Sequence, residues 1–99
     1  MRFYFRGQVF NLTFKKLRSD YGSCAYDKPR SIKITTDIKH KLLLDTLIHE
    51  ALHACYPDLD EEAINQSATD IAEYLWKLGY RSEIIPPKNK KRKIKSKKK

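Results

Sequence analysis

The stretch LIHEALHAC, residues 47–55, decides the fold that we predict for this chain. Apolar residues recur through it at three- and four-residue steps, and the same spacing extends back to Ile38. Because a helix advances about 100° per residue, this spacing turns one face toward a hydrophobic core. Asp37 can accept the free amide hydrogens of a helix that begins at Ile38, and Tyr56-Pro57 ends the pattern. We therefore expect one long amphipathic helix here.

A second helical pattern follows the acidic run DLDEE, residues 58–62. Acidic side chains in a first turn complement the positive end of the helix dipole, and Asp58 can cap the new helix. Apolar residues then recur at helical spacing, namely Ile64, Ala68, Ile71, Leu75 and Leu78. Gly79 is expected to end this helix, because glycine adopts the left-handed conformation that often closes a helix.

The first part of the chain carries the two-residue periodicity of strands. RFYFRGQVFNLTFKKL, residues 2–17, alternates apolar and polar positions around Gly7-Gln8, which predicts a β-hairpin with one buried face. Ser23 to Tyr26 and Ser31 to Thr35 are further short strands bounded by turn-forming residues. Together with the helices these segments predict an α+β domain, in which a three- to four-stranded, mostly antiparallel sheet packs on two helices.

The positive charge of the chain is concentrated at one end. The 99 residues carry a formal charge of +9, and the segment Lys88 to Lys99 holds nine basic residues and no acidic one. Residues 1–87 then carry 12 basic and 12 acidic residues. We predict one domain over residues 1–87 and a disordered basic tail over 88–99. Such a tail can bind nucleic acid through phosphate contacts without reading sequence, or serve merely to keep the protein in solution.

Cysteine usage and hydropathy limit the class of protein. Cys24 and Cys55 are far apart and form no CxxC pattern, so we expect neither a thiolate metal site nor a disulfide framework. The opening residues are too often interrupted by charge for a signal peptide, and no apolar stretch reaches the roughly 18 residues of a membrane span. We expect a cytoplasmic protein with no membrane partner.

His49, Glu50 and His53 form the motif that carries chemistry. Residues four apart on a helix share a face, so His49 and His53 can offer two imidazoles to one ion, while Glu50 can reach a water there without being a ligand. The residues around the motif are uncharged: Ile48, Ala51, Leu52, Ala54 and Cys55. A solvated helix with two coincidental histidines would normally carry charges there. The pattern therefore favours a catalytic zinc (Zn2+) site, which also needs a third protein ligand.

The acidic start of the second helix supplies the candidates for that ligand. Glu61 stands three residues before Ile64, and therefore projects from the face that packs inward. Glu62 is assigned instead to a flank with Asn65 and Thr69. We predict Glu61 as the ligand and keep Glu62 as the alternative, since predicted helix starts drift by about one residue.

These residues carry a family resemblance. His49-Glu50-x-x-His53 followed by a glutamate on the next helix resembles the gluzincin zinc metallopeptidases in their smallest forms, the minigluzincins. Glu61-x-x-x-Asn65-x-x-Ala68 is similar to the glutamate helix of ImmA/IrrE-type peptidases. The run HEALHACYPDLDEEA, with the later LWKLGYR, resembles small phage and bacterial proteins. The SprT-like group shares the general plan of an HExxH domain with DNA association, but takes a third histidine.

The resemblance implies a zincin-like fold and a metallopeptidase that acts on a protein or peptide substrate, in the host cytoplasm if a phage encodes it. Zinc would be held by His49, His53 and Glu61, with Glu50 as the general base. The strand that pairs with an extended substrate would be Ser31 to Thr35. Candidates for stabilising the oxyanion are Tyr21, Tyr26 and Tyr56. Two alternatives stay open, an inactive nucleic-acid-associated protein stabilised by zinc, and a zymogen in which a terminal segment occupies the fourth zinc position.

Overall fold

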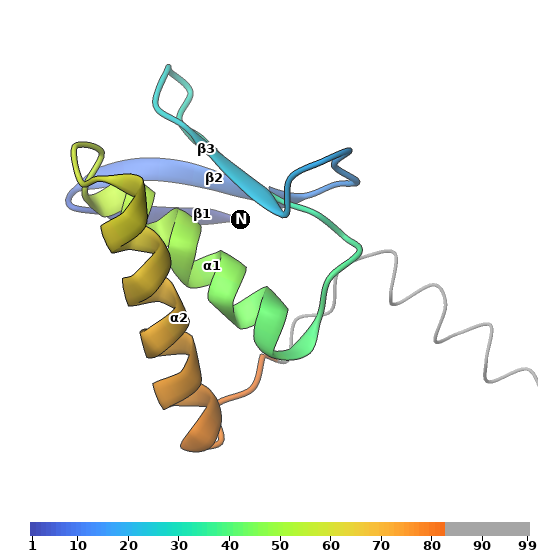
Figure 1. Ribbon diagram of the computed structural model, residues 1–99. Coiled ribbons are helices and arrows are strands. Elements are labelled where there is room, and N and C mark those ends of the chain that lie inside the picture. Colours follow the sequence, from blue (N-terminus) through green and yellow to red (C-terminus); the bar gives the residue numbers. More distant parts are fainter. Residues whose placement is uncertain (83–99) are drawn as a thin grey trace, which may run out of the picture.

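The computed structural model describes residues 1–82 and has the predicted α+β architecture (Figure 1). Its strands are β1 (Arg2–Phe5), β2 (Gln8–Phe14), β3 (Gly22–Ala25) and β4 (Ser31–Ile34), and its helices are α1 (His40–Cys55) and α2 (Glu61–Lys77). The end of the predicted domain, residues 83–87, and the predicted basic tail, 88–99, lie outside the described residues. Nucleic-acid binding by the tail therefore stays a prediction.

The four strands form one mixed sheet in the order β1-β2-β4-β3. The pairs β1–β2 and β3–β4 are antiparallel, and β2–β4 is parallel, so most pairings are antiparallel as predicted. Arg6 and Gly7 connect β1 to β2 with φ angles of 52° and 81°. A two-residue turn with both residues in this left-handed region matches the right-handed twist of the strands that it joins.

Ser31 to Thr35 was expected to supply an edge strand that pairs with substrate, but the strand formed there, β4, is central in the sheet. β4 lies between β2 and β3, and its side chains Ile32 and Ile34 are fully buried. Strand β2 of the β1–β2 hairpin pairs with β4 in parallel, and the chain between these two strands contains β3. Strand β3 pairs with the other side of β4 and therefore lies at the edge of the sheet. Local periodicity gave no signal for this order because it depends on a long-range pairing.

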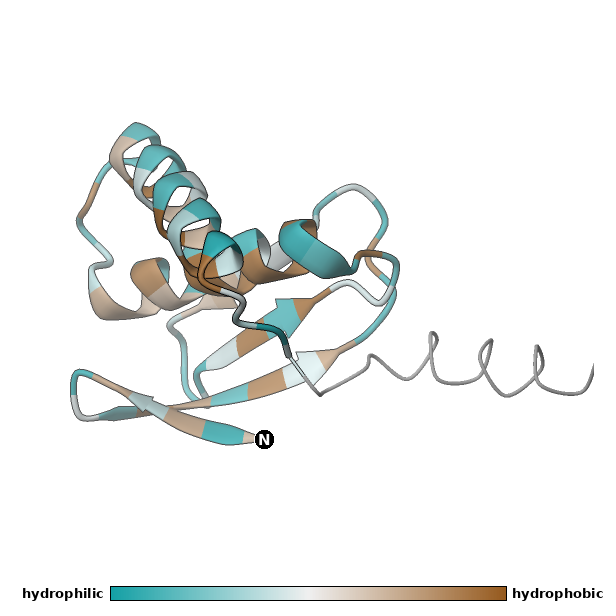
Figure 2. Cartoon of the chain, turned by 90° about the horizontal axis from the view of Figure 1, so that it is seen from below, coloured by the Kyte–Doolittle hydropathy of each residue, from teal (hydrophilic) through white to brown (hydrophobic). Residues whose placement is uncertain are grey.

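The hydrophobic core lies between one face of the sheet and α1. Alternate residues of β2 and β4 point into it, and Leu12 faces Ile32 in the register of the parallel pair. The core consists of Phe10, Leu12, Ile32, Ile34, Ile38, Leu43 and Ala54. Figure 2 shows the corresponding alternation of hydrophilic and hydrophobic residues along the strands.

Helix α1 begins two residues later than predicted. Its N-cap residue is Lys39, without a side-chain cap hydrogen bond, and Asp37 instead forms an ion pair of 3.4 Å with Lys16. Ile38 precedes the helix and is buried in the core, with 5% of its surface exposed. The predicted Asp37 cap is therefore wrong, because burial of Ile38 fixes the chain before the first turn. The predicted end is confirmed, since Tyr56 is the C-cap residue.

Helix α2 packs on the side of α1 that faces away from the sheet (Figure 1). Its buried residues are Ile64, Ala68 and Ala72, whereas Ile71 and Leu78 of the predicted stripe are 38% and 61% exposed. The face of α2 that is buried therefore follows Ile64, Ala68 and Ala72, which recur at four-residue steps, and Ile71 and Leu78 lie beside it. Gly79, at φ 96°, follows the last turn as predicted. Neither helix of the described residues is long and apolar enough to cross a membrane.

Asp60, and not Asp58, caps α2. Oδ1 of Asp60 accepts a hydrogen bond of 2.7 Å from the amide of Ala63. Replacement of an N-cap aspartate by alanine costs about 1 kcal/mol. We expect Asp60→Ala to lower the free energy of unfolding by about that amount in urea denaturation. Asp58→Ala is the matched control, and a loss as large as that of Asp60→Ala would contradict this assignment.

Candidate metal centre

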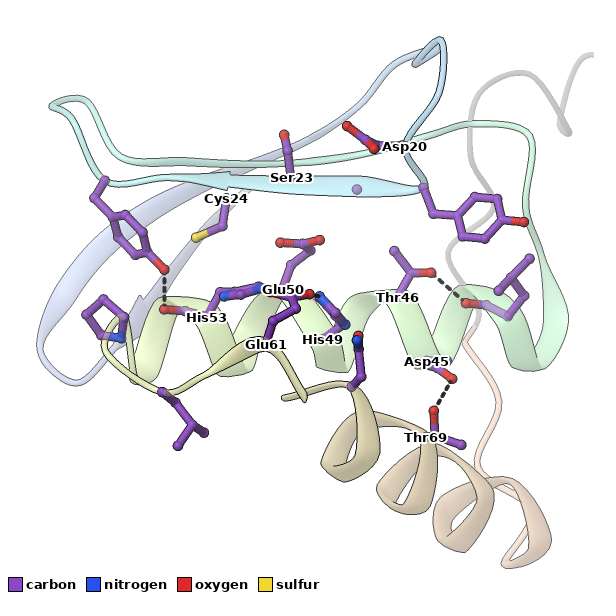
Figure 3. Close-up of a pocket in the computed structure, with 17 residues that line it drawn as sticks. Asp20, Ser23, Cys24, Asp45, Thr46, His49, Glu50, His53, Glu61 and Thr69 are labelled. Atoms are coloured by element: carbon purple, nitrogen blue, oxygen red, sulfur yellow. Dashed lines mark hydrogen bonds and ion pairs between the residues drawn. The ribbon is translucent and has the colours of Figure 1, made fainter. Parts of the chain in front are cut away.

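The side chains of His49, His53 and Glu61 converge on one point between α1 and the start of α2 (Figure 3). The Nε2 atoms of the two histidines are 3.2 Å apart. Oε2 of Glu61 lies 3.2 Å from Nε2 of His49, and Oε1 lies 3.2 Å from Nε2 of His53. The three residues that the sequence predicted as ligands are thus brought together.

Two elements position these groups. His49 and His53 stand one turn apart on α1, so their rings project from the same face of the helix. Glu61 is the first residue of α2, and the short connection after Tyr56 turns the chain back toward α1. A hydrogen bond of 3.1 Å from the amide of Leu59 to the carbonyl of Tyr56 closes that turn. The tight turn is what allows so short an interval between the second histidine and the glutamate.

The separations suit a metal ion. Ligands that lie 2.0–2.1 Å from a tetrahedral zinc stand roughly 3.3 Å from one another, close to the 3.2 Å between these donor atoms. All the ligand atoms of the cluster lie within 4.8 Å of one another. The cluster can therefore hold a metal ion. Two imidazoles with one carboxylate form a donor set that zinc accepts readily.

Of the two candidate glutamates, Glu61 belongs to the cluster. Glu62 is outside the cluster, and its Oε2 accepts a hydrogen bond of 3.4 Å from Gln66. The assignment of Asn65 and Thr69 to the flank of Glu62 is wrong, because both line the same cleft as Glu61. They follow Glu61 at intervals of four residues, and therefore share its face.

The cluster opens into a cleft of about 820 Å³. β3 borders the cleft on one side of α1, and α2 borders it on the other (Figure 3). None of the lining residues is a lysine or an arginine, although the chain has 21 of them. The lining consists of Asp20, Tyr21, Gly22, Ser23, Cys24, Tyr26, Leu42, Asp45, Thr46, His49, Glu50, His53, Pro57, Leu59, Glu61, Asn65 and Thr69.

Glu50 is buried next to the cluster without being part of it. Its side chain points from α1 toward β3, and 5% of the residue surface is exposed (Figure 3). Burial raises the pKa of Glu50 from 4.5 to about 7, and the nearby carboxylates of Glu61 and Asp20 add to this increase. A carboxyl group with a pKa near neutrality can accept and release a proton under ordinary conditions. The position predicted for a general base therefore has the matching acidity.

Tyr26 and Cys24 lie on the β3 side of the cleft. The hydroxyl of Tyr26 donates a hydrogen bond of 2.7 Å to the backbone carbonyl of His53. Burial raises the pKa of Tyr26 to about 12, so the hydroxyl stays protonated as a donor. Burial also raises the pKa of Cys24 to about 11, which keeps this residue a neutral thiol near pH 7. Both cysteines are free, as the sequence predicted.

The three tyrosines that the sequence suggested for stabilising the oxyanion differ in whether they line the cleft. Tyr21 and Tyr26 line the cleft, whereas Tyr56 lies outside it, with the guanidinium of Arg6 at 5.5 Å from its ring. Sequence reasoning missed Gly22 and Cys24, which share the inward face of β3. Their two-residue spacing was a usable signal, but the strand had first to be recognised as the neighbour of the helix.

Comparisons of this chain with protein-family models, curated proteins and solved structures found no match.

Removal of a predicted ligand should abolish stoichiometric metal binding. We expect His49→Ala, His53→Ala and Glu61→Ala each to weaken zinc binding by more than about 100-fold, because changes in residues that merely support ligands already cost 10- to 100-fold. Competition with a chromophoric chelator measures this affinity. Glu62→Ala is the matched control on α2, and it should bind zinc as the wild type does. Equal affinities for all variants would exclude this cluster as the site.

The pKa of Glu50 should make the stability of the metal-free protein depend on pH. The folded pKa lies above the unfolded value, so the stabilisation is complete below pH 4.5 and is lost as pH rises toward 7. We expect the loss to be on the order of 2–3 kcal/mol, measured by urea denaturation with a chelator present. Glu50→Gln should lack this component, and an identical pH dependence in both proteins would contradict the assignment.

Proposed function

We propose that this protein is a zinc metallopeptidase of the gluzincin type. The observation that carries the proposal is the convergence of His49, His53 and Glu61 beside the buried carboxyl of Glu50, in a cleft open to solvent. Bound zinc supplies a Lewis acid that polarises a carbonyl group and makes water acidic near neutral pH. Metal ligands and a proton acceptor of suitable pKa are the two requirements of hydrolysis by activated water.

The proposed mechanism gives separate roles to the metal ligands and to the general base. His49, His53 and Glu61 hold the ion. Glu50 accepts a proton from the attacking water and later passes it to the nitrogen of the leaving amine. Its raised pKa suits both transfers, since the group must be deprotonated for the first and protonated for the second.

An extended peptide fits along β3. This strand pairs with β4 on one side, and Gly22, Ser23 and Cys24 border the cleft on the way to the metal cluster. The backbone groups of an edge strand can bind an extended peptide as an additional strand, which fixes its register without selecting its side chains. We therefore assign to β3 the substrate-pairing role that the sequence suggested for Ser31 to Thr35.

Tyr26 is our candidate for stabilising the oxyanion. It lines the cleft, and its hydrogen bond to the carbonyl of His53 places the hydroxyl near one ligand residue. With a pKa of about 12 the phenol stays protonated, and its single O–H would turn from the carbonyl of His53 to donate to developing negative charge on the substrate oxygen. Tyr21 lines the cleft as well, but no described hydrogen bond connects it to a ligand residue.

Glu50→Gln separates metal binding from catalysis. We expect this variant to bind zinc stoichiometrically and to lower kcat by at least about 100-fold, because the amide cannot accept the proton. The assay is cleavage of a mixed peptide library followed by mass spectrometry, with zinc measured on the same samples. Glu62→Gln makes the same chemical change outside the cluster and should retain full activity. Equal turnover of wild type and Glu50→Gln would overturn the proposed mechanism.

A further inference from the structure

Gly22 is the residue of β3 that lies against Glu50. A β-carbon at position 22 would lie 3.1 Å from both Cγ and Oε2 of Glu50. It would also lie 3.0 Å from Cγ2 of Thr46. These separations are shorter than the ordinary van der Waals contacts of 3.4–4 Å. No side chain larger than hydrogen fits here without a shift of its neighbours.

The backbone does not require glycine at this position. Among the described residues the glycines with positive φ are Gly7 and Gly79, and Gly22 is not one of them. Alanine could therefore adopt the local conformation of Gly22 without strain. The reason for glycine at position 22 is space, not conformational freedom.

The surroundings of Gly22 have little room to move. Gly22 pairs with Ile34, which is completely buried, and the amide of Thr35 donates a hydrogen bond of 2.8 Å to the carbonyl of Tyr21. On the helix side, Oγ1 of Thr46 donates a hydrogen bond of 2.9 Å to the carbonyl of Leu42, which fixes the direction of the Thr46 methyl group. Strand and helix are both held, so of the two contacting side chains the longer one, Glu50, has more freedom to shift than Thr46.

We infer that Gly22 is a positioning residue, which leaves the space in which the carboxylate of Glu50 is held between β3 and α1. A side chain at position 22 would displace this carboxylate by a few tenths of an ångström. The catalytic consequence rests on the proposed function, because small displacements of a catalytic group cost rate only where that group acts. The steric relation between the two residues does not depend on it.

A thermodynamic mutant cycle, measured by unfolding of the metal-free, full-length protein, tests whether Gly22 makes room for its neighbours on α1. We expect Gly22→Ala to lower the urea midpoint of the wild type. A Thr46→Ser/Glu50→Ala background removes the atoms that a β-carbon at position 22 would contact, namely Cγ2 of Thr46 and Cγ and Oε2 of Glu50. Serine keeps the hydroxyl group at position 46. In that background the same substitution should raise the midpoint, because alanine restricts the unfolded chain more than glycine does.

The reversal of sign is the decisive result. Equal lowering of the midpoint in both backgrounds, or failure to fold in both, would overturn the inference. Folding of Gly22→Ala in the relieved background alone would support it. Ala25→Ser also adds one heavy atom to β3, at an exposed position outside the cleft. This control should change the midpoint equally in the two backgrounds.

A kinetic measurement tests the catalytic consequence. In the otherwise wild-type protein, Gly22→Ala should lower kcat at least tenfold, with zinc content and KM unchanged. An unchanged kcat would overturn the positioning role. If the wild type shows no peptidase activity, the proposed function fails, and the stability measurements still decide whether Gly22 makes room for the side chains of Thr46 and Glu50.

Discussion

Helix α1 is packed on two sides, and the rest of the molecule depends on this arrangement. One face covers the inner side of the sheet, where it buries Leu43 and Ala54 against the strands, and α2 lies against the other side. In a chain this small, few elements other than a central helix can be covered twice. Because α1 is held from both directions, groups on its surface keep fixed positions relative to β3 and to α2 at the same time.

The candidate site uses both of these contacts. The contact with α2 brings Glu61 to the two histidines, so the cluster that could hold a metal ion joins two helices that are also joined by hydrophobic packing. The contact with β3 encloses Glu50, and the resulting loss of hydration is the main reason for its raised pKa. The two histidines and Glu50 therefore lie on neighbouring faces of α1, but they are completed by different partners, α2 and β3.

Polar groups of the helix end are satisfied by residues distant in the sequence. Tyr26 donates to the carbonyl of His53, and Arg6 donates a hydrogen bond of 3.1 Å to the carbonyl of Cys55. The last carbonyls of a helix have no partner within the helix, so they accept from other groups. These two bonds tie the hairpin and β3 to the last turn of α1, the turn that carries the second histidine.

The sequence by itself determined the elements and most of the cluster. Periodicity and the tight turn after Tyr56 were sufficient to predict two helices, and the four-residue spacing of His49 and His53 placed both rings on one face, since helix geometry is local. Glu61 was preferred over Glu62 on the same ground. The tertiary structure alone decided that β4 is central and β3 is the edge, and that Gly22 lies against Glu50. Those outcomes depend on strand order and on the distance between packed elements, which no local pattern encodes.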